Sequence, residues 1–427
     1  MSKPKRSPWF WVPSLYYAEG LPYVVVMTLS VIMYKRLDIS NTDIALYTSW
    51  LYLPWVIKPL WSPLVDLLKT KRFWIIAMQL VIGAGLAGVA LMLPGDNVFR
   101  YTLAFMWLLA FSSATHDIAA DGFYMLGMSE GEQAYFVGIR STFYRLAMIS
   151  GQGLLVMLAG VLENSMAIPT AWAITFYIMT GIFIVAAAYH AFVLPRPAVD
   201  VPRAHQSAGE VLRDFGATFA TFFKKDHIGV ILGFLLLYRF AEAQLVKIAS
   251  PFLLDERAVG GLGLATESVG FVYGTVGVVG LTIGGILGGI VVSRDGLKRW
   301  LWWMVAAINL PNAVYVFLAM TQPENFVVVN VAVAIEQFGY GFGFTAFLMY
   351  MIHVADGPYK TAHYALCTGV MALGMMLPGM ISGAIQEALG YQTFFLWILV
   401  ATIPSFIVTY FIRIPADFGK KEQSEVA

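Results

Sequence analysis

Apolar runs of about 20 residues recur along the whole chain, separated by short polar or Pro- and Gly-rich segments. One example is FWIIAMQLVIGAGLAGVALML, at residues 73–93. Such a run is long enough to cross a bilayer as an α-helix, and it lacks the alternation of a membrane-spanning β-strand. Only 12% of the residues are charged, against roughly 25% in an average soluble domain. The sequence therefore predicts an all-α membrane protein.

The apolar runs predict about twelve membrane-spanning helices. Their expected ranges are roughly 9–34, 43–65, 73–93, 99–127, 136–161, 168–194, 227–254, 267–292, 299–320, 325–353, 361–386 and 391–413. The connection at 195–226 is polar, has three prolines near its start and then becomes weakly amphipathic. We expect two six-helix halves, 1–194 and 227–413, joined by a linker at 195–226 with a surface helix and followed by a tail at 414–427.

The lysines and arginines of the connections orient the predicted helices. Only Lys35, Arg36, Arg100 and Arg257 fall on one side of the predicted membrane, and the other loop and terminal ones fall on the opposite side. Because positively charged loops stay in the cytoplasm, both termini and the linker are expected to be cytoplasmic. The first apolar run is long and no small-residue cleavage site follows it, so we expect a membrane helix rather than a removed signal peptide.

Several classes of function are excluded or disfavoured by what the chain contains. The net charge of +1 argues against a nucleic-acid partner, and the single cysteine, Cys367, excludes an intrachain disulfide. His116, His353 and His363 are isolated, so no metal site is expected. No nucleotide-binding loop is present, which excludes a self-contained ATP-driven pump. We expect no cofactor.

The ionisable residues inside the predicted spans are the strongest functional signal, because each costs roughly 2.5–3.5 kcal/mol to insert. They are Glu19, Lys58, Asp117, Asp121, Arg140, Arg145, Arg239, Glu242, Lys247 and Glu336. Every carboxylate lies on the first, fourth, seventh or tenth span, which is the step expected of three-helix repeats. The sequence predicts that Glu19, Asp117, Asp121, Arg140, Arg145, Arg239, Glu242 and Glu336 bind protons or solute.

Asp117 and Asp121, in THDIAADGF, are four residues apart and share one helix face. At ~1.5 Å per residue, Asp121 and Arg140 are expected about 9 and 6 Å from the cytoplasmic end, and Asp117 and Arg145 about 15 and 14 Å. Depth therefore pairs Asp121 with Arg140 and Asp117 with Arg145. The two arginines project ~140° apart, so we expect one firm pair and one looser partner. The pairs either only lock neighbouring helices, or at least one aspartate binds a proton or solute.

The other charged positions carry separate expectations. Glu19 is followed by Gly20 and Pro22, which should interrupt the first helix. Lys58 either snorkels or pairs with an acid. Arg239 and Glu242 are three residues apart and are expected to pair within one helix.

Uncharged residues complete the expected cavity and packing. The residues expected to line a cavity are Tyr16, Tyr23, His116, Tyr144, Lys247, Gln337 and Tyr340, with Lys247 as a contact for an anion. Gly280, Gly284 and Gly288 have the small-xxx-small spacing of closely packed membrane helices.

Two short loops echo each other, SPLVDLLKTKRFW from Ser62 and GGIVVSRDGLKRW from Gly288. Such internal symmetry is typical of transporter halves. The second loop resembles the major facilitator superfamily motif G-x-x-x-D-R-x-G followed by two basic residues, with Ser293 in place of the aspartate. The resemblance implies gating roles for Asp66, Arg72, Arg294, Asp295 and Arg299.

A more specific resemblance covers both halves. SSATHDIAADGFYM looks like the S-x-x-x-Q-D-I-x-x-D segment of AmpG-type muropeptide permeases. YRLAMISGQG from Tyr144, KPLWSPLVD from Lys58, EQFGYGFGFTAFLMYM from Glu336 and the stretch from His363 also match in order. The whole chain thus resembles the AmpG-type permeases and their acetyl-CoA transporter relatives within the major facilitator superfamily. It departs from their pattern at His116 (usually glutamine), Phe123 (tryptophan), Glu242 (aspartate) and Leu67 (a basic residue).

The resemblance implies a monomeric carrier in a bacterial inner membrane that works by alternating access and imports a solute with protons. The implied cargo is N-acetylglucosaminyl-anhydromuramyl material from the cell wall. Alternatives are another mono- or oligosaccharide, a siderophore or a coenzyme A ester, or a membrane sensor without transport. A membrane enzyme would need a nucleophile and base together, which the sequence does not indicate.

Overall fold

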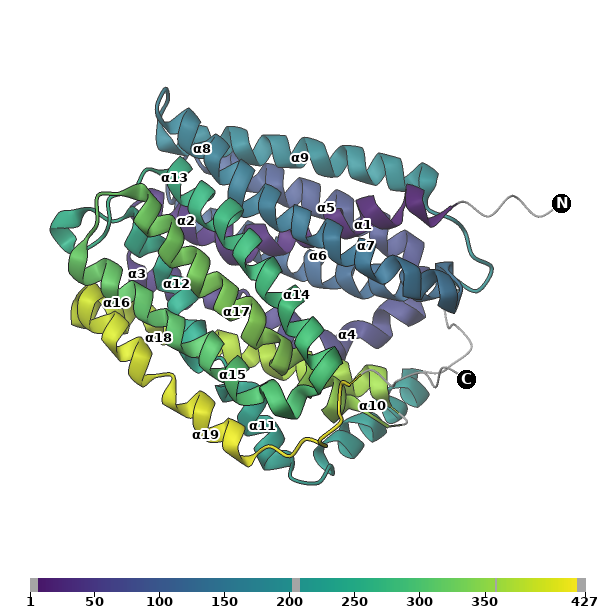
Figure 1. Cartoon of the computed structure of the whole chain (residues 1–427). Coiled ribbons are helices and arrows are strands. Elements are labelled where there is room, and N and C mark those ends of the chain that lie inside the picture. Colours follow the sequence, from purple (N-terminus) through teal and green to yellow (C-terminus); the bar gives the residue numbers. More distant parts are fainter. Residues whose placement is uncertain (1–6, 202–207, 358, 421–427) are drawn as a thin grey trace. The chain divides into compact units, whose positions relative to one another are not determined.

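The computed structural model describes residues 7–201, 208–357 and 359–420, apart from some side chains that include Asp66. Residues 202–207 of the predicted linker and 421–427 of the predicted tail lie outside the described residues. The α-helices in chain order (Figure 1) are α1 (Val12–Val24), α2 (Ser30–Arg36), α3 (Asn41–Trp50), α4 (Leu53–Leu68), α5 (Lys71–Met92), α6 (Val98–Gly127), α7 (Glu130–Met148), α8 (Val156–Glu163), α9 (Ile168–Val193), α10 (Ala208–Phe223), α11 (Ile228–Leu237), α12 (Phe240–Leu254), α13 (Thr266–Gly270), α14 (Val278–Asp295), α15 (Leu297–Asn309), α16 (Ala313–Thr321), α17 (Phe326–Ala355), α18 (Lys360–Val400) and α19 (Ile403–Phe411).

The predicted membrane helices are present in the structure. Ten helices of the described chain are long and apolar enough to cross a membrane. The last of them, Lys360–Phe411, has 52 residues and bends at Gly390, where φ is 72°, so it is long enough for two spans. Residues 41–68 add α3 and α4, separated by a turn at 51–52. These additions account for the predicted set of about twelve spans, and the all-α fold is confirmed.

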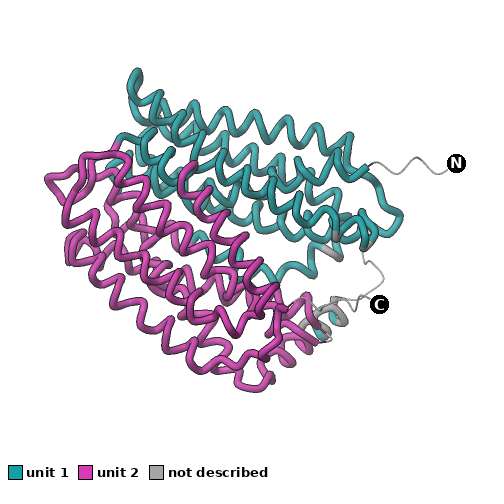
Figure 2. The backbone as a smooth tube through the Cα atoms, viewed as in Figure 1, with its two compact units in different colours: residues 1–39, 51–214, 265–274 teal, residues 40–50, 215–264, 275–427 magenta. Residues whose placement is uncertain are grey.

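The chain forms two compact units, each assembled from separate stretches of sequence (Figure 2). Unit 1 contains Met1–Ile39, Leu51–Asp214 and Ala265–Gly274, and unit 2 contains Ser40–Trp50, Phe215–Leu264 and Thr275–Ala427. The second span is thus divided, because α3 belongs to unit 2 and α4 to unit 1. The eighth span is divided in the opposite sense, with α13 in unit 1 and α14 in unit 2.

In unit 1 the first span continues past the predicted interruption. Gly20 and Pro22 lie inside α1, and the helix then widens into a π-helical segment at Val25–Leu29. Proline lacks an N–H and clashes with the turn before it, so one hydrogen bond of the helix is lost. A π-helical turn, which contains one extra residue, accommodates this distortion. Gly20 serves close packing, since a Cβ there would lie 3.0 Å from the Cβ of Ala147 on α7.

In unit 2 the glycines of α17 let it pack between two neighbouring helices. A Cβ on Gly341 would lie 2.1 Å from the carbonyl oxygen of Leu281 on α14. A Cβ on Gly339 would lie 2.1 Å from the carbonyl oxygen of Ala307 on α15. The glycines of α14 pack as closely, because a Cβ on Gly284 would lie 2.1 Å from the carbonyl oxygen of Phe338. The predicted close contact at the small-xxx-small glycines is confirmed.

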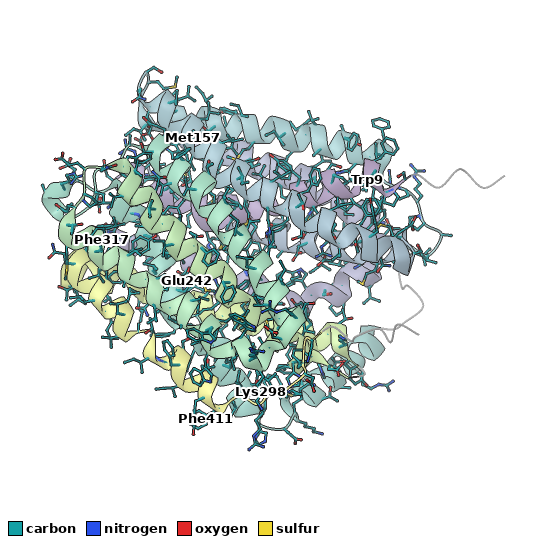
Figure 3. All side chains as sticks on the ribbon, in the orientation of Figure 1. Trp9, Met157, Glu242, Lys298, Phe317 and Phe411 are labelled. Carbon is teal, nitrogen blue, oxygen red and sulfur yellow. The ribbon has the colours of Figure 1, made fainter. Side chains whose placement is uncertain are left out.

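Large apolar side chains cover much of the surface, as expected for helices that face lipid. Trp9, Phe317 and Phe411, which Figure 3 labels, are 52%, 48% and 57% exposed. Soluble monomers rarely expose apolar surface on this scale. Together with the helix lengths, this shows an integral membrane protein.

Candidate functional site

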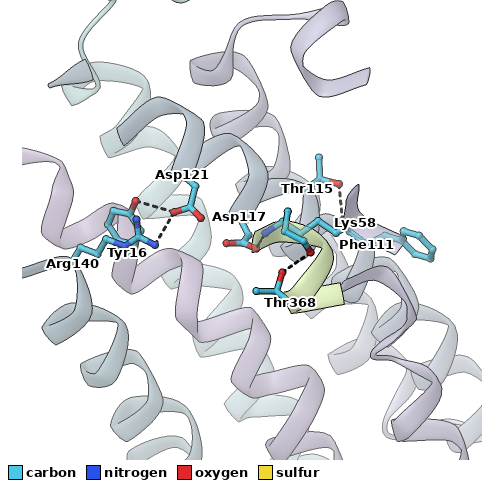
Figure 4. A network of polar contacts seen from close by, with 9 residues as sticks. Tyr16, Lys58, Phe111, Thr115, Asp117, Asp121, Arg140 and Thr368 are labelled. Carbon is cyan, nitrogen blue, oxygen red and sulfur yellow. Dashed lines mark hydrogen bonds and ion pairs between the residues drawn. The ribbon is translucent and has the colours of Figure 1, made fainter. Parts of the chain in front are cut away.

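Four helices of unit 1 bring charged side chains together inside the bundle, and Figure 4 shows those of α4, α6 and α7. Glu19 lies on α1, Asp117 and Asp121 on α6, Lys58 on α4 and Arg140 on α7. One carboxylate oxygen from each of the three acids lies within 4.8 Å of the other two. The predicted residues of the first and fourth spans therefore form one cluster.

Asp121 is held by two partners. The Arg140 guanidinium lies 2.9 Å from Asp121 Oδ1, and the Tyr16 hydroxyl donates to the same oxygen at 3.2 Å. Arg140 also lies over the Tyr16 ring, 4.5 Å from its centroid, which is a cation–π contact. The predicted pair of Asp121 with Arg140 is confirmed, and Tyr16 lies at the site as expected.

Asp117 is paired with Lys58, which reaches it from α4. The predicted pair of Asp117 with Arg145 is wrong. Arg145 is half-buried on α7 and makes no ion pair with any residue that the structure describes. Equal depth did not bring them together, because Arg145 projects from a different side of α7 than Arg140. Of the two expectations for Lys58, pairing with an acid is the one observed.

Glu19 differs from the two aspartates. It is 7% exposed, and its Oε2 atom has no hydrogen-bond partner among the described residues. If all five groups were ionised, the three carboxylates and two cations would leave one negative charge. The oxygens are close enough to hold a metal ion, but two carboxylates are already paired with cations. The arrangement therefore suits one added positive charge.

The other candidate cavity residues of unit 1 are in different surroundings. Tyr23 packs edge-to-face on Trp55, with ring centroids 5.2 Å apart. Tyr144 is half-buried and lies beside Gly20, where an added Cβ would approach its ring to 3.2 Å. His116 is 1% exposed and hydrogen-bonded to Gln79, a residue that the sequence did not single out.

In unit 2 the Arg239 side chain is directed at α17. It donates to the Tyr340 hydroxyl, and its guanidinium lies 5.2 and 4.9 Å from the Tyr340 and Phe344 ring centroids. Arg239 is the N-cap of α12, with non-helical φ and ψ of −109° and 22°, and Glu242 lies in the first turn of the same helix. The pairing of Arg239 with Glu242 stays a prediction.

The two carboxylates of unit 2 are buried. Glu336 is 2% exposed and accepts from Gln337 at 2.9 Å and from Tyr315 at 3.5 Å. Glu242, labelled in Figure 3, is 6% exposed, and its Oε2 has no hydrogen-bond partner among the described residues. Each half of the chain thus contains a buried acid with one unsatisfied oxygen.

Lys247 is a buried cation in unit 2, only 1% exposed. Its ammonium group donates to the Thr48 hydroxyl of α3 at 2.9 Å. Thr48 carries no charge and lies 199 residues away, so the sequence offered no signal for this contact.

The two echoing loops both carry organised polar contacts. Asp295 lies 2.9 Å from Arg294 and 3.7 Å from Arg299, and it accepts from the Trp300 indole at 2.8 Å. In the first loop, Arg72 donates to the carbonyl oxygens of Ala191 and Leu194. The side chain of Asp66 lies outside the described residues.

Comparison with known proteins gives matches over nearly the whole chain. The family model described as Major Facilitator Superfamily matches residues 18–365. The anhydromuropeptide permease of Escherichia coli K12 is 26% identical over 414 residues, covering 95% of this chain and 79% of that protein. These matches confirm the resemblance that the sequence motifs indicate.

Solved structures support the same fold. The nucleoside transporter NupG has a TM-score of 0.70 at 16% identity and covers 94% of this chain and 98% of its own. A D-xylose-proton symporter has a TM-score of 0.69 at 11% identity, with 96% and 98% covered. At these identities the similarity concerns the fold alone.

Proposed function

Since the chain belongs to the Major Facilitator Superfamily, we propose that it imports a cell-wall-derived amino-sugar solute together with protons. It is a secondary transporter and not an enzyme, because its relatives and structural neighbours are permeases and transporters. The finer features of the proposal are a monomer in a bacterial inner membrane, alternating access, and termini in the cytoplasm.

The cluster of Glu19, Asp117 and Asp121 carries the proposal of proton coupling. Lys58 and Arg140 neutralise two of the three carboxylates, and a net charge inside the membrane is costly. A proton on Glu19 makes the cluster neutral, and the Oε2 atom of Glu19 has no hydrogen-bond partner among the described residues. Each proton that enters down 100 mV supplies about 2.3 kcal/mol for solute accumulation.

The proposed cargo is an N-acetylglucosaminyl-anhydromuramyl saccharide or muropeptide. The permease name of the E. coli relative supports this class. Such solutes carry carboxylates, and unit 2 offers two cations, Arg239 and Lys247, on α12 or directly before it. Arg239 lies on the aromatic rings of Tyr340 and Phe344, and aromatic faces are also suitable for packing on sugar rings.

The test is uptake of labelled solute into proteoliposomes that contain the purified protein and an imposed inward proton gradient. We expect accumulation of anhydromuropeptide that stops when a protonophore removes the gradient. The alternative solutes, tested in parallel, are labelled N-acetylglucosamine, a disaccharide without peptide and a coenzyme A ester. Protein-free liposomes are the control. If only an alternative solute accumulates under the gradient, the proposed muropeptide cargo is rejected. If no solute accumulates under the gradient, the proposal of proton-driven transport is rejected.

A further inference from the structure

A chain of buried hydrogen bonds crosses unit 1 beside the charged cluster. The Ser14 hydroxyl of α1 lies 2.9 Å from Nε2 of His190 on α9. His190 Nδ1 lies 3.0 Å from Oε1 of Gln79 on α5, and Nε2 of Gln79 lies 3.0 Å from Nε2 of His116 on α6. His190 and Gln79 are 0% exposed and His116 is 1% exposed. Four helices are thus joined by side chains that the function proposed above does not use.

The orientation of the Gln79 amide determines where the protons of both imidazoles lie. Its carbonyl oxygen can only accept, so His190 donates from Nδ1, and His190 Nε2 faces the Ser14 hydroxyl, which also lies 3.3 Å from the Trp11 carbonyl oxygen. Its NH₂ group can only donate, so His116 accepts at Nε2 and carries its proton on Nδ1. This orientation of the Gln79 amide gives both histidines the Nδ1–H tautomer, whereas the reversed amide would give both the Nε2–H tautomer.

The chain does not conduct protons. A side-chain amide passes a proton only if its nitrogen loses one while its oxygen gains one, which makes an unstable imidic acid. Gln79 therefore separates the two histidines chemically while it joins them mechanically. A mechanical role also fits the position of His116, which directly precedes Asp117 on α6.

Neighbouring residues on a helix project about 100° apart. Gln79 of α5 holds His116 directly and links it to His190 of α9, so the rotation of α6 is set and Asp117 faces Lys58 on α4. The His116 Nδ1 atom has no hydrogen-bond partner among the described residues. Gln79 is therefore the contact that anchors this imidazole.

We propose that Ser14, His190, Gln79 and His116 form a positioning chain that holds Asp117 opposite Lys58 during transport. The consequence for transport rests on the proposed function, whereas the tautomers do not. In the permease-like pattern the residue before the first aspartate is glutamine, whose amide oxygen also accepts from an amide N–H. His116→Gln should therefore preserve the chain.

The tautomers are tested without any transport assay. The protein has six histidines, so the ¹⁵N spectrum of histidine-labelled protein in nanodiscs is simple enough to assign by single substitutions. We expect the signals that His190→Gln and His116→Gln remove to be those of neutral Nδ1–H imidazoles. In Gln79→Leu the His116 signal should move. An Nε2–H or doubly protonated His116 in the wild-type protein would overturn the assignment.

The transport role is tested with Gln79→Leu, which breaks both central bonds. We expect about a tenfold lower initial rate of gradient-driven uptake, a displaced pH at half-maximal rate, and less than a twofold change in His116→Gln. Thr175→Val is the matched control, because Thr175 is a buried residue of α9 whose side chain, among the described residues, bonds only to Ala171 of its own helix.

The same substitution is also made in a protein that lacks the Lys58–Asp117 pair. With Lys58→Met and Asp117→Asn combined, Gln79→Leu should not slow solute exchange further. If Gln79→Leu lowers folded yield and solute exchange equally in the wild-type protein and in the double variant, the chain is merely structural. If Gln79→Leu leaves uptake unchanged, the chain does not position Asp117 for transport. If the wild-type protein shows no gradient-driven uptake, the proposed function fails, and the ¹⁵N result still decides the tautomers.

Discussion

At the scale of single residues, Asp117 and Asp121 each have a cation as a partner, while Glu19 has an unsatisfied oxygen. A group that takes up and releases a proton in each cycle must exist in both states. A carboxylate in a fixed ion pair strongly favours its charged state. Glu19 is therefore better suited to the exchange of protons than either aspartate.

Glu19→Gln mimics the protonated acid permanently. We expect accumulation driven by a proton gradient to fall at least tenfold, because the proton site is lost. Solute exchange without a gradient should continue, because the neutral form is part of the cycle. Both are measured in proteoliposomes, with Asp96→Asn, an exposed loop acid, as the control. Normal accumulation in Glu19→Gln would exclude Glu19 as the coupling group.

Asp117→Asn and Asp121→Asn should differ in stability. Asp117→Asn leaves the Lys58 ammonium without its acid, whereas Asp121→Asn leaves Arg140 on the rings of Tyr16 and Tyr124, 4.5 and 5.4 Å from their centroids. The side chains of Lys58 and Asp117 are 23% and 20% exposed. We therefore expect a loss of about 1–3 kcal/mol for Asp117→Asn, below the ~3–5 kcal/mol of a fully buried pair.

The measurement is thermal unfolding in detergent. Asp121→Asn should lose about 0.5–1 kcal/mol, since a partly exposed ion pair contributes little. Adding Lys58→Met to Asp117→Asn should restore part of the loss. Identical unfolding temperatures for the two single variants would contradict the assignment of Lys58 as the partner.

At the scale of helices, the contact of α14 with α17 depends on glycine. The Cβ of Gly284→Ala would lie 2.1 Å from a backbone carbonyl oxygen, which cannot rotate away as a side chain could. We expect a loss of about 1–3 kcal/mol in the free energy of unfolding, because the two helices must separate. Gly289→Ala, whose Cβ meets nothing within 4 Å, should change it by less than about 0.5 kcal/mol. Equal stability of the two variants would show that the helices are not in close contact.

The helices could be predicted from the sequence. The ion pairs of the charged cluster in unit 1 could be predicted only in part. Apolar runs end where polar residues begin, so the predicted range 99–127 differs from α6, Val98–Gly127, by one residue. Depth along a helix follows from the same count and correctly paired Asp121 with Arg140. The direction of a side chain around its helix depends on tertiary packing, which no local pattern records. Depth alone therefore pairs Asp117 with Arg145, whereas its partner in the structure is Lys58.

At the scale of the whole molecule, the two units exchange segments. Residues 40–50 are held in unit 2 by polar contacts that include Asn41 with Gln386 at 2.7 Å. Residues 265–274 are held in unit 1, where Thr266 donates to Glu163 at 2.8 Å. The linker is therefore one of several covalent connections between the units, and each half of the sequence supplies a piece of both.

This exchange predicts the behaviour of a divided chain. When residues 1–201 and 208–427 are expressed as separate chains in one cell, with a tag only on the first, the second should co-purify in detergent. Replacing Asn41 and Thr42 with alanine should lower the recovery, because it removes the contacts to Gln386 and Glu387. Recovery of the tagged fragment alone would contradict the exchange.

The same division of the second span has a consequence for synthesis. Thr42 bonds to Glu387, which is 345 residues further along the chain. At ~5–20 residues per second, a ribosome needs roughly 17–70 s to bridge that distance. During this interval α3 is already in the membrane while its lasting neighbour, α18, has not been made. The polar start of α3 must be shielded by the insertion machinery or by lipid headgroups until then, so interrupted translation should leave this segment without its contacts to Gln386 and Glu387.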